Sequence, residues 1–221
     1  MPNLTLYNYF RSSTSFRTRI ALNLKGLDYS YKPVHLINNG GEQNSPEFRS
    51  LNPMGGVPTL IHDGHVISQS FAIIEYLDEA FKQGLQLFPG DSLKKAKIRE
   101  FCQIINADIH SYGNLKTLQY LQKNFKATDA EKNQWIKDFF TSGLQACEKI
   151  LETTSGSFCF GDQITAAECF LIPVLFTAQR FNVPLNDFKN SLRINNECLS
   201  IEAFKKAHPF RQPDTPNELK V

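Results

Sequence analysis

This sequence has no cysteine among its first 101 residues. The five cysteines that follow are widely spaced: Cys102, Cys147, Cys159, Cys169 and Cys198. None belongs to a C-x-x-C pair or stands with histidines at the spacing of a zinc site. Most fall within apolar helical patterns, which predicts buried, reduced thiols rather than disulfides or metal ligands. We therefore expect no metal site.

An excess of charge of one sign is also missing, as are long apolar runs. The 24 basic and 22 acidic residues give a net charge of +2, which argues against nucleic-acid or anionic-membrane partners recruited by bulk charge. No apolar run approaches the roughly 20 residues of a membrane helix. The N-terminus lacks the basic segment and apolar core of a signal peptide. We expect a soluble cytoplasmic protein with one large or two small domains.

The first 82 residues show alternating strand and helix patterns. The predicted elements are a strand over 4–7, a helix ending near Gly26, a strand over 29–35, a short helix over 45–51, strands over 57–61 and 65–67, and a helix beginning at Ser70. Asp63-Gly64 is a strong signal for a tight hairpin between the last two strands. The order predicts a parallel crossover followed by an antiparallel hairpin on one mixed sheet.

The pattern changes after residue 82. Gly84, Pro89 and Gly90 indicate a linker over 83–91. Beyond it, apolar residues recur at helical spacing: Ile98, Phe101, Ile105, Ile109 and Tyr112. Capping-box spacing is found twice, at Thr128 with Glu131 and at Thr165 with Glu168. We expect an α/β domain over 1–82 and an all-α domain over 92–221.

The segment from Arg11 to Leu22 is the most informative part of the chain. Four consecutive hydroxyl residues, 12–15, precede an amphipathic helix. One would suffice to cap it, so the others are left at the positive end of the helix dipole. With arginines on either side, this environment suits a thiolate, a carboxylate or both. Arg17 and Arg19 project about 200° apart on a helix, and we expect Arg19 to be a surface or interdomain cation.

Two further segments are candidate ligand sites. A proline at the start of a strand, as in Val57-Pro58, lies at an edge or in a cis turn. Because only about 5% of such bonds are cis, we expect a trans bond. A cis turn would instead leave the Val57 N–H and C=O available to a bound peptide. Ser70 is expected to be a helix N-cap, and with Gln69 it could also bind the two ends of an amino acid.

The first helix of the second domain carries an uncharged polar stripe: Gln103, Asn106, His110 and Asn114. Such a stripe can be a solvated face. However, solvated faces usually carry lysine and glutamate, so the amides and the histidine are also consistent with the wall of a cleft.

These segments together resemble the zeta class of the cytosolic glutathione transferases, the maleylacetoacetate isomerases. The matching motifs are Ser12-Ser13-x-x-Phe16-Arg17-x-Arg19-Ile20-Ala21-Leu22, Leu51-Asn52-Pro53-Met54, Val57-Pro58-Thr59-Leu60, Gln69-Ser70-x-Ala72-Ile73-Ile74-Glu75-Tyr76-Leu77, Gly161-Asp162-x-x-Thr165 and His208-Pro209-x-Arg211-Gln212-Pro213-Asp214. The resemblance runs from Leu4 to Leu219. It implies the cytosolic glutathione transferase fold: a thioredoxin-like N-terminal domain followed by an all-helical C-terminal domain, assembled as a homodimer.

The resemblance also implies roles for individual residues. Ser12 would hydrogen-bond the glutathione sulfur, with Ser13 and Thr14 beside it. The remaining glutathione-binding residues would be Gln43, Val57, Gln69 and Ser70, with His110 and Asn114 closing the site from the helical domain. Arg11, Arg17 and Arg180 would meet the substrate's carboxylates, and Ser13 and Arg17 would take part in catalysis together with Ser12.

Two positions depart from the pattern of this class. Thr14 stands where the class usually has cysteine, and His110 where it usually has glutamine. Threonine keeps a hydroxyl donor but cannot form a mixed disulfide. The protonation of His110 can make ligand affinity depend on pH.

The chemistry implied is isomerisation of 4-maleylacetoacetate to 4-fumarylacetoacetate, a step of tyrosine and phenylalanine catabolism. It proceeds by reversible addition of the glutathione thiolate to the cis double bond. Alternatives are glutathione conjugation or dehalogenation of small α-halo acids, and a non-catalytic binding module. The presence of Ser12, Gln69 and Ser70 argues against the binding module.

Overall fold

The computed structural model describes residues 3–221, apart from the side chain of Asn39. The chain forms two compact units, one comprising the residues up to Leu87 together with Leu199–Val221, the other Phe88–Cys198. This division differs from the predicted boundaries, which placed all of 92–221 in the helical domain. The last part of the chain instead packs on the first unit.

The first unit contains a four-stranded mixed sheet. Its strands are β1 (Leu4–Asn8), β2 (Ser30–Pro33), β3 (Thr59–His62) and β4 (His65–Ser68), in the order β2-β1-β3-β4. β1 pairs in parallel with β2, whereas β1–β3 and β3–β4 are antiparallel. Asp63 and Gly64 both have positive φ, at 48° and 84°, as a two-residue hairpin turn requires. The predicted crossover and hairpin are confirmed.

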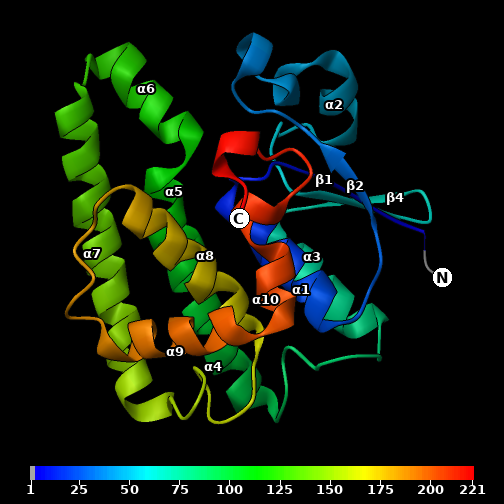
Figure 1. Cartoon of the computed structure of the whole chain (residues 1–221), viewed down its shortest axis with the longest axis vertical. Coiled ribbons are helices and arrows are strands. Elements are labelled where there is room, and N and C mark those ends of the chain that lie inside the picture. Colours follow the sequence, from blue (N-terminus) through cyan, green and yellow to red (C-terminus); the bar gives the residue numbers. More distant parts are fainter. Residues whose placement is uncertain (1–2) are drawn as a thin grey trace. The chain divides into compact units, whose positions relative to one another are not determined.

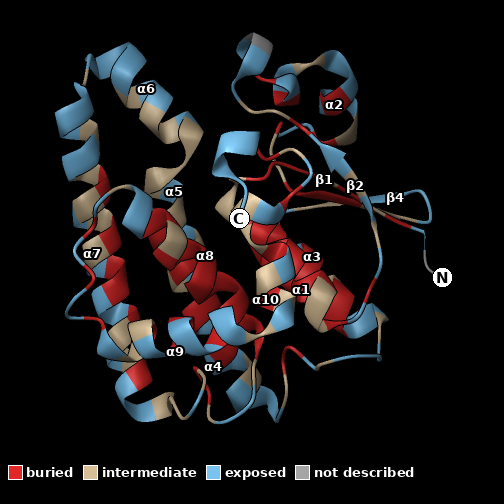
Figure 2. Ribbon diagram, viewed as in Figure 1, coloured by how far each residue is buried: buried red, intermediate tan, exposed pale blue. Residues whose placement is uncertain are grey.

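Helices lie on both faces of this sheet. They are α1 (Ser13–Leu24), α2 (Pro46–Leu51) and α3 (Ser70–Ala80), with short 3₁₀ turns η1 (Asn38–Gly40) and η2 (Glu42–Asn44) before α2. α1 and α3 pack against each other and are largely buried (Figures 1 and 2). Leu6 is fully buried. Tyr7, which alternates to the opposite face, contacts Phe48 of α2 with ring centroids 6.1 Å apart.

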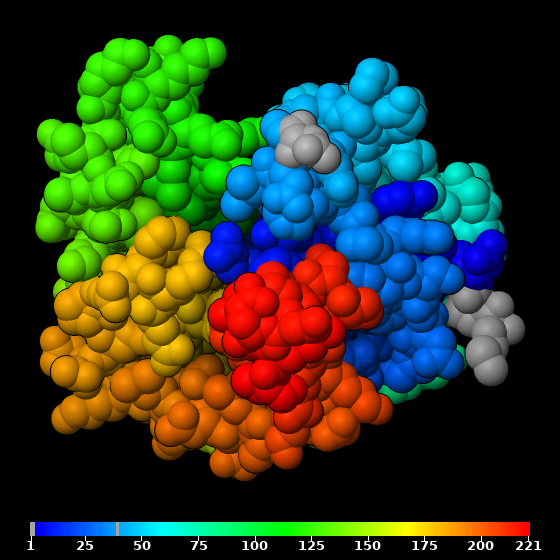
Figure 3. Space-filling view, turned by 45° about the horizontal axis from the view of Figure 1, so that its top comes forward, coloured from blue at the N-terminus to red at the C-terminus, as the bar shows by residue number. Residues whose placement is uncertain are grey.

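The C-terminal segment completes the first unit. It comprises α10 (Glu202–Ala207), η4 (Pro209–Arg211) and η5 (Asn217–Leu219). α10 packs along α1, and the amide nitrogen of Asn23 donates to the Ala203 carbonyl at 2.8 Å. In Figure 3 this segment, in red, lies against the dark blue atoms from the beginning of the chain.

The second unit is helical. Its elements are α4 (Ser92–Gln103), the π-helix η3 (Ile104–Ile109), α5 (His110–Gly113), α6 (Leu115–Phe125), α7 (Asp129–Thr154), α8 (Ala166–Arg180) and α9 (Lys189–Ser200), which ends at the boundary between the units. Both predicted capping boxes are present, at the starts of α7 and α8. α8 is the central helix of this unit and is buried over most of its length (Figure 2).

The π-helix corrects one prediction. A regular helix would have carried Gln103, Asn106, His110 and Asn114 on one face. The π-helical segment changes the register after Gln103, and the helix ends at Gly113, so Asn114 is the N-cap of α6 rather than a residue of the same stripe. Gly143 of α7 allows this segment to pack closely, since a Cβ there would lie 2.2 Å from Ile109 Cγ1.

Among residues 3–221, no helix combines the length and the apolar character needed to cross a membrane.

Candidate active site

The hydroxyl cluster lies at the N-terminus of α1, as predicted. Ser12 is the N-cap, and its Oγ accepts a hydrogen bond from the Ser15 N–H at 3.2 Å. The same Oγ lies 2.9 Å from Thr14 Oγ1. Thr14 Oγ1 in turn donates to the backbone carbonyl of Val57 at 2.9 Å. A continuous line of hydrogen bonds therefore joins the α1 cap to the Val57 backbone.

The Val57-Pro58 peptide bond is cis, so the expectation of a trans bond was wrong. Val57 precedes the ladder, which begins at Thr59. Asn52 stabilises the turn, because its side-chain nitrogen donates hydrogen bonds to the Gly56 carbonyl at 2.8 Å and to Thr59 Oγ1 at 3.1 Å. Sequence reasoning quoted Asn52 within a motif but assigned it no role. Its position just after a short helix and before Gly55-Gly56 was the available signal.

Gln69 and Ser70 begin α3, but in a different way from the prediction. The N-cap is Gln69, and Ser70 is the first helical residue, so Ser70 was wrongly expected to be the cap. Gln69 has φ +72° and ψ 114°, a conformation that non-glycine residues rarely adopt. Its side chain is exposed, whereas Ser70 is buried. Such backbone outliers cluster at ligand-binding sites.

The three arginines of the N-terminal segment have different environments. Arg17 is 1% exposed, and its Nη1 donates to Ser70 Oγ at 3.3 Å. Arg11 is half-buried, with its guanidinium carbon 5.9 Å from the centre of the Phe10 ring. Arg17 is therefore placed to orient Ser70, whereas Arg11 retains partial access to solvent.

Arg19 is fully buried, so it is not a surface cation; it does bond to Ala207, which the predicted boundaries placed in the other domain. Its guanidinium donates to four oxygens: Ala207 O at 3.0 Å, Asn8 Oδ1 at 3.0 Å, Phe10 O at 2.9 Å and Tyr9 O at 3.4 Å. Burial lowers the pKa of Arg19, because desolvation penalises the charged form. The residue ties the end of β1 to the end of α10.

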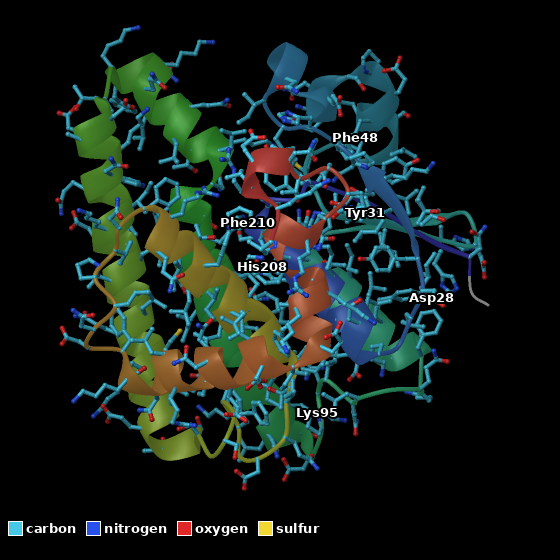
Figure 4. All side chains as sticks on the ribbon, in the orientation of Figure 1. Asp28, Tyr31, Phe48, Lys95, His208 and Phe210 are labelled. Carbon is cyan, nitrogen blue, oxygen red and sulfur yellow. The ribbon has the colours of Figure 1, made fainter. Side chains whose placement is uncertain are left out.

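Asp214 makes a second connection between the C-terminal segment and the approach to α1. Its Oδ2 accepts from the Phe10 N–H at 2.9 Å, and its Oδ1 accepts a short hydrogen bond from the Tyr31 hydroxyl. Burial raises the pKa of Tyr31, so this phenol stays protonated as a donor. Tyr31 lies on β2, and His208 and Phe210 mark the C-terminal segment beside it (Figure 4). Sequence reasoning included Asp214 in a motif without a role, because its partners are distant in the chain.

Gln43 lies in η2, and only 9% of its surface is exposed. Its side-chain nitrogen donates to the Leu36 carbonyl at 3.2 Å, while its buried Oε1 has no hydrogen-bond partner among the described residues. A buried acceptor without a protein partner is unusual, and it is open to a hydrogen bond from a bound water or ligand. Gly41, at φ +92°, makes room for this side chain, since a Cβ there would lie 2.4 Å from Gln43 Nε2.

Three expected site residues belong to the second unit. His110 is the half-buried first residue of α5. Asn114 Oδ1 accepts from the Thr117 N–H at 2.9 Å, and its Nδ2 donates to the Ser111 carbonyl at 2.9 Å. Arg180 ends α8, exposed, with its guanidinium 4.7 Å from the centre of the Phe181 ring.

All five cysteines are free and buried. In the part of the chain that the structure describes, no three histidine, cysteine, aspartate or glutamate side chains are grouped as metal ligands would be.

Comparison with known proteins decides the family. Residues 2–79 match the glutathione S-transferase N-terminal domain. Maleylacetoacetate isomerase of Mus musculus is 44% identical over 98% of this chain and 97% of its own length. The zeta-class glutathione S-transferase of Euphorbia esula is 42% identical over 97% of this chain and 93% of its own length. This chain belongs to the zeta-class glutathione transferases.

Solved zeta-class structures agree with the fold. A holo maleylpyruvate isomerase superposes with a TM-score of 0.92 at 38% identity, covering 96% of this chain and all of that one. Maleylacetoacetate isomerase from Anaeromyxobacter dehalogenans, with dicarboxyethyl glutathione and citrate in its active site, gives 0.86 at 34% identity, covering 98% and 95%. The thioredoxin-like N-terminal fold and the glutathione transferase family are thus established for this chain.

Proposed function

We propose that this zeta-class enzyme isomerises 4-maleylacetoacetate to 4-fumarylacetoacetate with glutathione as cofactor. The observation that carries the proposal is the Ser12–Thr14–Val57 hydrogen-bonded line at the start of α1, in a chain 44% identical to a maleylacetoacetate isomerase. It places a hydroxyl donor and a peptide carbonyl at the positive end of one helix. A cysteine-containing peptide can use both groups, because the hydroxyl can donate to its thiolate and the carbonyl can accept from its backbone N–H.

The residues of the first unit suit glutathione. The unsatisfied Oε1 of Gln43 offers a buried acceptor to a backbone N–H or an ammonium group. Val57 lies outside the ladder, which begins at Thr59, so its backbone can pair with the cysteinyl unit. Ser70, at the first turn of α3, and the exposed Gln69 suit the γ-glutamyl carboxylate and ammonium. Bound glutathione supplies a thiolate that adds reversibly to the cis double bond and so permits rotation.

Ser12 carries the main catalytic role. A free thiol titrates near ~8.5, so only a few per cent is ionised at neutral pH. A hydroxyl donor and the α1 dipole both favour the anion and increase the ionised fraction. Ser13 is the first residue of α1, and its backbone N–H belongs to the same positive terminus.

Arginines provide the charge that a dicarboxylate requires. Arg11 is the first-unit candidate for a substrate carboxylate, because it keeps partial solvent access. Arg180 is the second-unit candidate and is exposed. Arg17 acts through Ser70 in this proposal, since its guanidinium is buried beneath that hydroxyl. The catalytic role expected for Arg17 thereby becomes one of positioning.

The proposal includes His110 and Asn114 as second-unit contributors to the glutathione site. It also includes a homodimer in the cytoplasm, where the five reduced thiols would persist. Sedimentation equilibrium tests the dimer, because a mass near twice the 25.1 kDa of one chain is expected. A species of one-chain mass at micromolar concentration would refute it.

A second candidate substrate is maleylpyruvate. The structure with a TM-score of 0.92 to this chain is a maleylpyruvate isomerase, and both substrates present a cis double bond conjugated to a carbonyl. The same Ser12 donor serves either reaction. The ratio of kcat/KM for the two substrates decides between them.

The test is an assay with catalytic glutathione and each cis substrate, following the trans product. We expect turnover in which glutathione is not consumed. Ser12→Ala should lower kcat by roughly 10²–10³-fold, as loss of a single donor to a developing anion does. Ser45→Ala is the matched control, because Ser45 caps α2 in the same way, accepting from the Phe48 N–H at 3.2 Å.

Two results would contradict the proposal. Glutathione consumed one-for-one with chloro acids, without isomerisation, would make the chain a conjugating or dehalogenating enzyme. Equal turnover by Ser12→Ala and Ser45→Ala would remove Ser12 from its role.

A further inference from the structure

The hydroxyl of Thr14 lies between two groups that the proposed function uses separately. Thr14 Oγ1 is 2.9 Å from Ser12 Oγ and 2.9 Å from the Val57 carbonyl oxygen. Ser12 would stabilise the thiolate, and Val57 would hold the backbone of the cysteinyl unit. Thr14 is the one residue whose described side-chain hydrogen bonds reach both.

The number of protons limits this arrangement. Thr14 has one hydroxyl proton, and a carbonyl oxygen can only accept. When Thr14 donates to Val57, Ser12 must therefore be the donor of the Ser12–Thr14 bond. The Ser15 N–H already donates to Ser12 Oγ. In this state the only proton of Ser12 is directed at Thr14 and is not available to a sulfur.

A second arrangement uses the same heavy-atom positions. If Thr14 rotates its proton from the Val57 carbonyl to Ser12 Oγ, Ser12 becomes free to donate elsewhere. The rotation costs the Val57 carbonyl a hydrogen bond. A backbone N–H of a bound peptide replaces that lost donor. Occupation of the Val57 carbonyl by a ligand N–H therefore lowers the cost of turning the Thr14 proton to Ser12 and releasing the Ser12 proton.

We propose that Thr14 is a positioning residue that couples the two halves of the site: when the ligand's backbone engages the Val57 carbonyl, Thr14 turns to Ser12 and frees the Ser12 proton for the thiolate. The proposal rests on glutathione binding as described above. A hydroxyl chain of this kind also polarises each of its members, so Ser12 becomes a stronger donor when Thr14 donates to it.

The residue type at position 14 matters for this role. A hydroxyl both donates and accepts within about 2.9 Å, whereas a thiol is a weak donor and a weak acceptor. A cysteine, which the resemblance to the zeta class gives as usual at this position, would not form the same chain of hydrogen bonds. The coupling is thus a property of the threonine in this sequence.

The experiment measures the pKa of the bound glutathione thiol from the ultraviolet absorbance of the thiolate, together with the Kd from calorimetry. In the unaltered enzyme the bound thiol should titrate below the free thiol. Thr14→Val keeps the shape and removes the hydroxyl, and it should raise the pKa of the bound thiol by about half to one unit. Thr14→Ser should restore the original value.

The matched control is Thr18→Val. Thr18 is buried one turn later on α1, and its hydroxyl bonds only weakly to the Thr14 carbonyl, at 3.4 Å. It makes the same chemical change without touching Ser12 or Val57, so the pKa of the bound thiol should not move.

A glutathione analogue tests the coupling itself. In this analogue an ester oxygen replaces the cysteinyl amide N–H, so it cannot donate to the Val57 carbonyl. In the unaltered enzyme it should show a smaller bound-minus-free pKa shift than glutathione does. In Thr14→Val the two ligands should show equal shifts.

The possible outcomes separate the two proposals. If the unaltered enzyme fails to bind glutathione or to ionise it, the proposed function and the coupling both fail. If it ionises glutathione normally but gives the same shift for both ligands, the coupling alone is overturned, and this comparison needs no variant to fold. A Thr14→Val enzyme that titrates like the unaltered one overturns it equally.

Discussion

Replacing Arg19 by methionine should lower the free energy of unfolding by about 3–5 kcal/mol. Arg19 is fully buried and donates to four oxygens, three of them backbone carbonyls. Methionine fills much of the same space but donates nothing. The acceptors would remain buried without this partner, and each such group costs about 1–3 kcal/mol, partly relieved by relaxation.

The expected change in melting temperature follows from the size of the chain. For 150–250 residues, 1 kcal/mol corresponds to about 2–4 °C, so the midpoint should fall by about 6–20 °C. Arg19→Lys should recover only part of this loss. An ammonium group keeps the charge but cannot reach acceptors on two sides as the planar guanidinium does.

The assay is thermal denaturation followed by circular dichroism, with Arg193→Met as the matched control. Arg193 is exposed, and both of its side-chain hydrogen bonds are 3.3 Å long. Its replacement should cost about 1 kcal/mol or less. If the two variants melt within a degree or so of each other, the Arg19 connection contributes little and the reasoning is wrong.

Three further predictions concern the site and the titratable groups. Gln69→Gly should raise the melting temperature, because glycine accepts φ +72° without strain, and it should also increase the Kd for glutathione. Gln69→Ala keeps the backbone strain, so it should increase the Kd without raising the melting temperature. Equal melting temperatures for the two variants would contradict the argument. The free energy of unfolding should fall as the pH rises above about 10, because the raised pKa of Tyr31 makes the folded state keep a proton that the unfolded chain releases. Tyr31→Phe should reduce that slope by roughly 1.4 kcal/mol per pH unit in urea titrations, and an unchanged slope would exclude Tyr31 as the source. Iodoacetamide should leave activity intact and label no cysteine until the chain unfolds, because all five cysteines are buried and burial raises the pKa of Cys147 to about 12. Mass spectrometry locates any label. Rapid inactivation of the folded enzyme by labelling of a cysteine would contradict this prediction.

Local patterns predicted the elements of the first unit well. The hydroxyl residues that begin α1 and the Asp63-Gly64 turn depend on neighbours a few residues away, and the structure confirms both the helix and the hairpin. The prediction that one of these hydroxyl residues caps α1 is also confirmed, and the cap is Ser12. Short-range chemistry is sufficient where the partner of a group lies within one turn of the chain.

The wrong predictions concern the start of α3, the residue after the π-helical segment and the Val57-Pro58 bond. Ser70 carries a good capping side chain, but Gln69 takes the cap position with a positive φ that no pattern in the sequence announces. Asn114 was placed by counting a regular helix through a π-helical segment. The cis bond at Pro58 was contrary to the base rate, and the close packing around Asn52 accompanies it.

Residue types at fixed short spacing were enough to predict the order of strands and helices, the capping boxes, the hydroxyl cluster and the resemblance to the zeta class. Tertiary packing buries Arg19 against the C-terminal segment and brings the Asp214 carboxylate to the backbone N–H of Phe10. It also decided that the Thr14 hydroxyl lies between Ser12 and the Val57 carbonyl. The Arg19–Ala207, Phe10–Asp214 and Thr14–Val57 hydrogen bonds join residues 188, 204 and 43 positions apart, and a hydrogen bond depends on distance in space, which spacing along the chain does not specify.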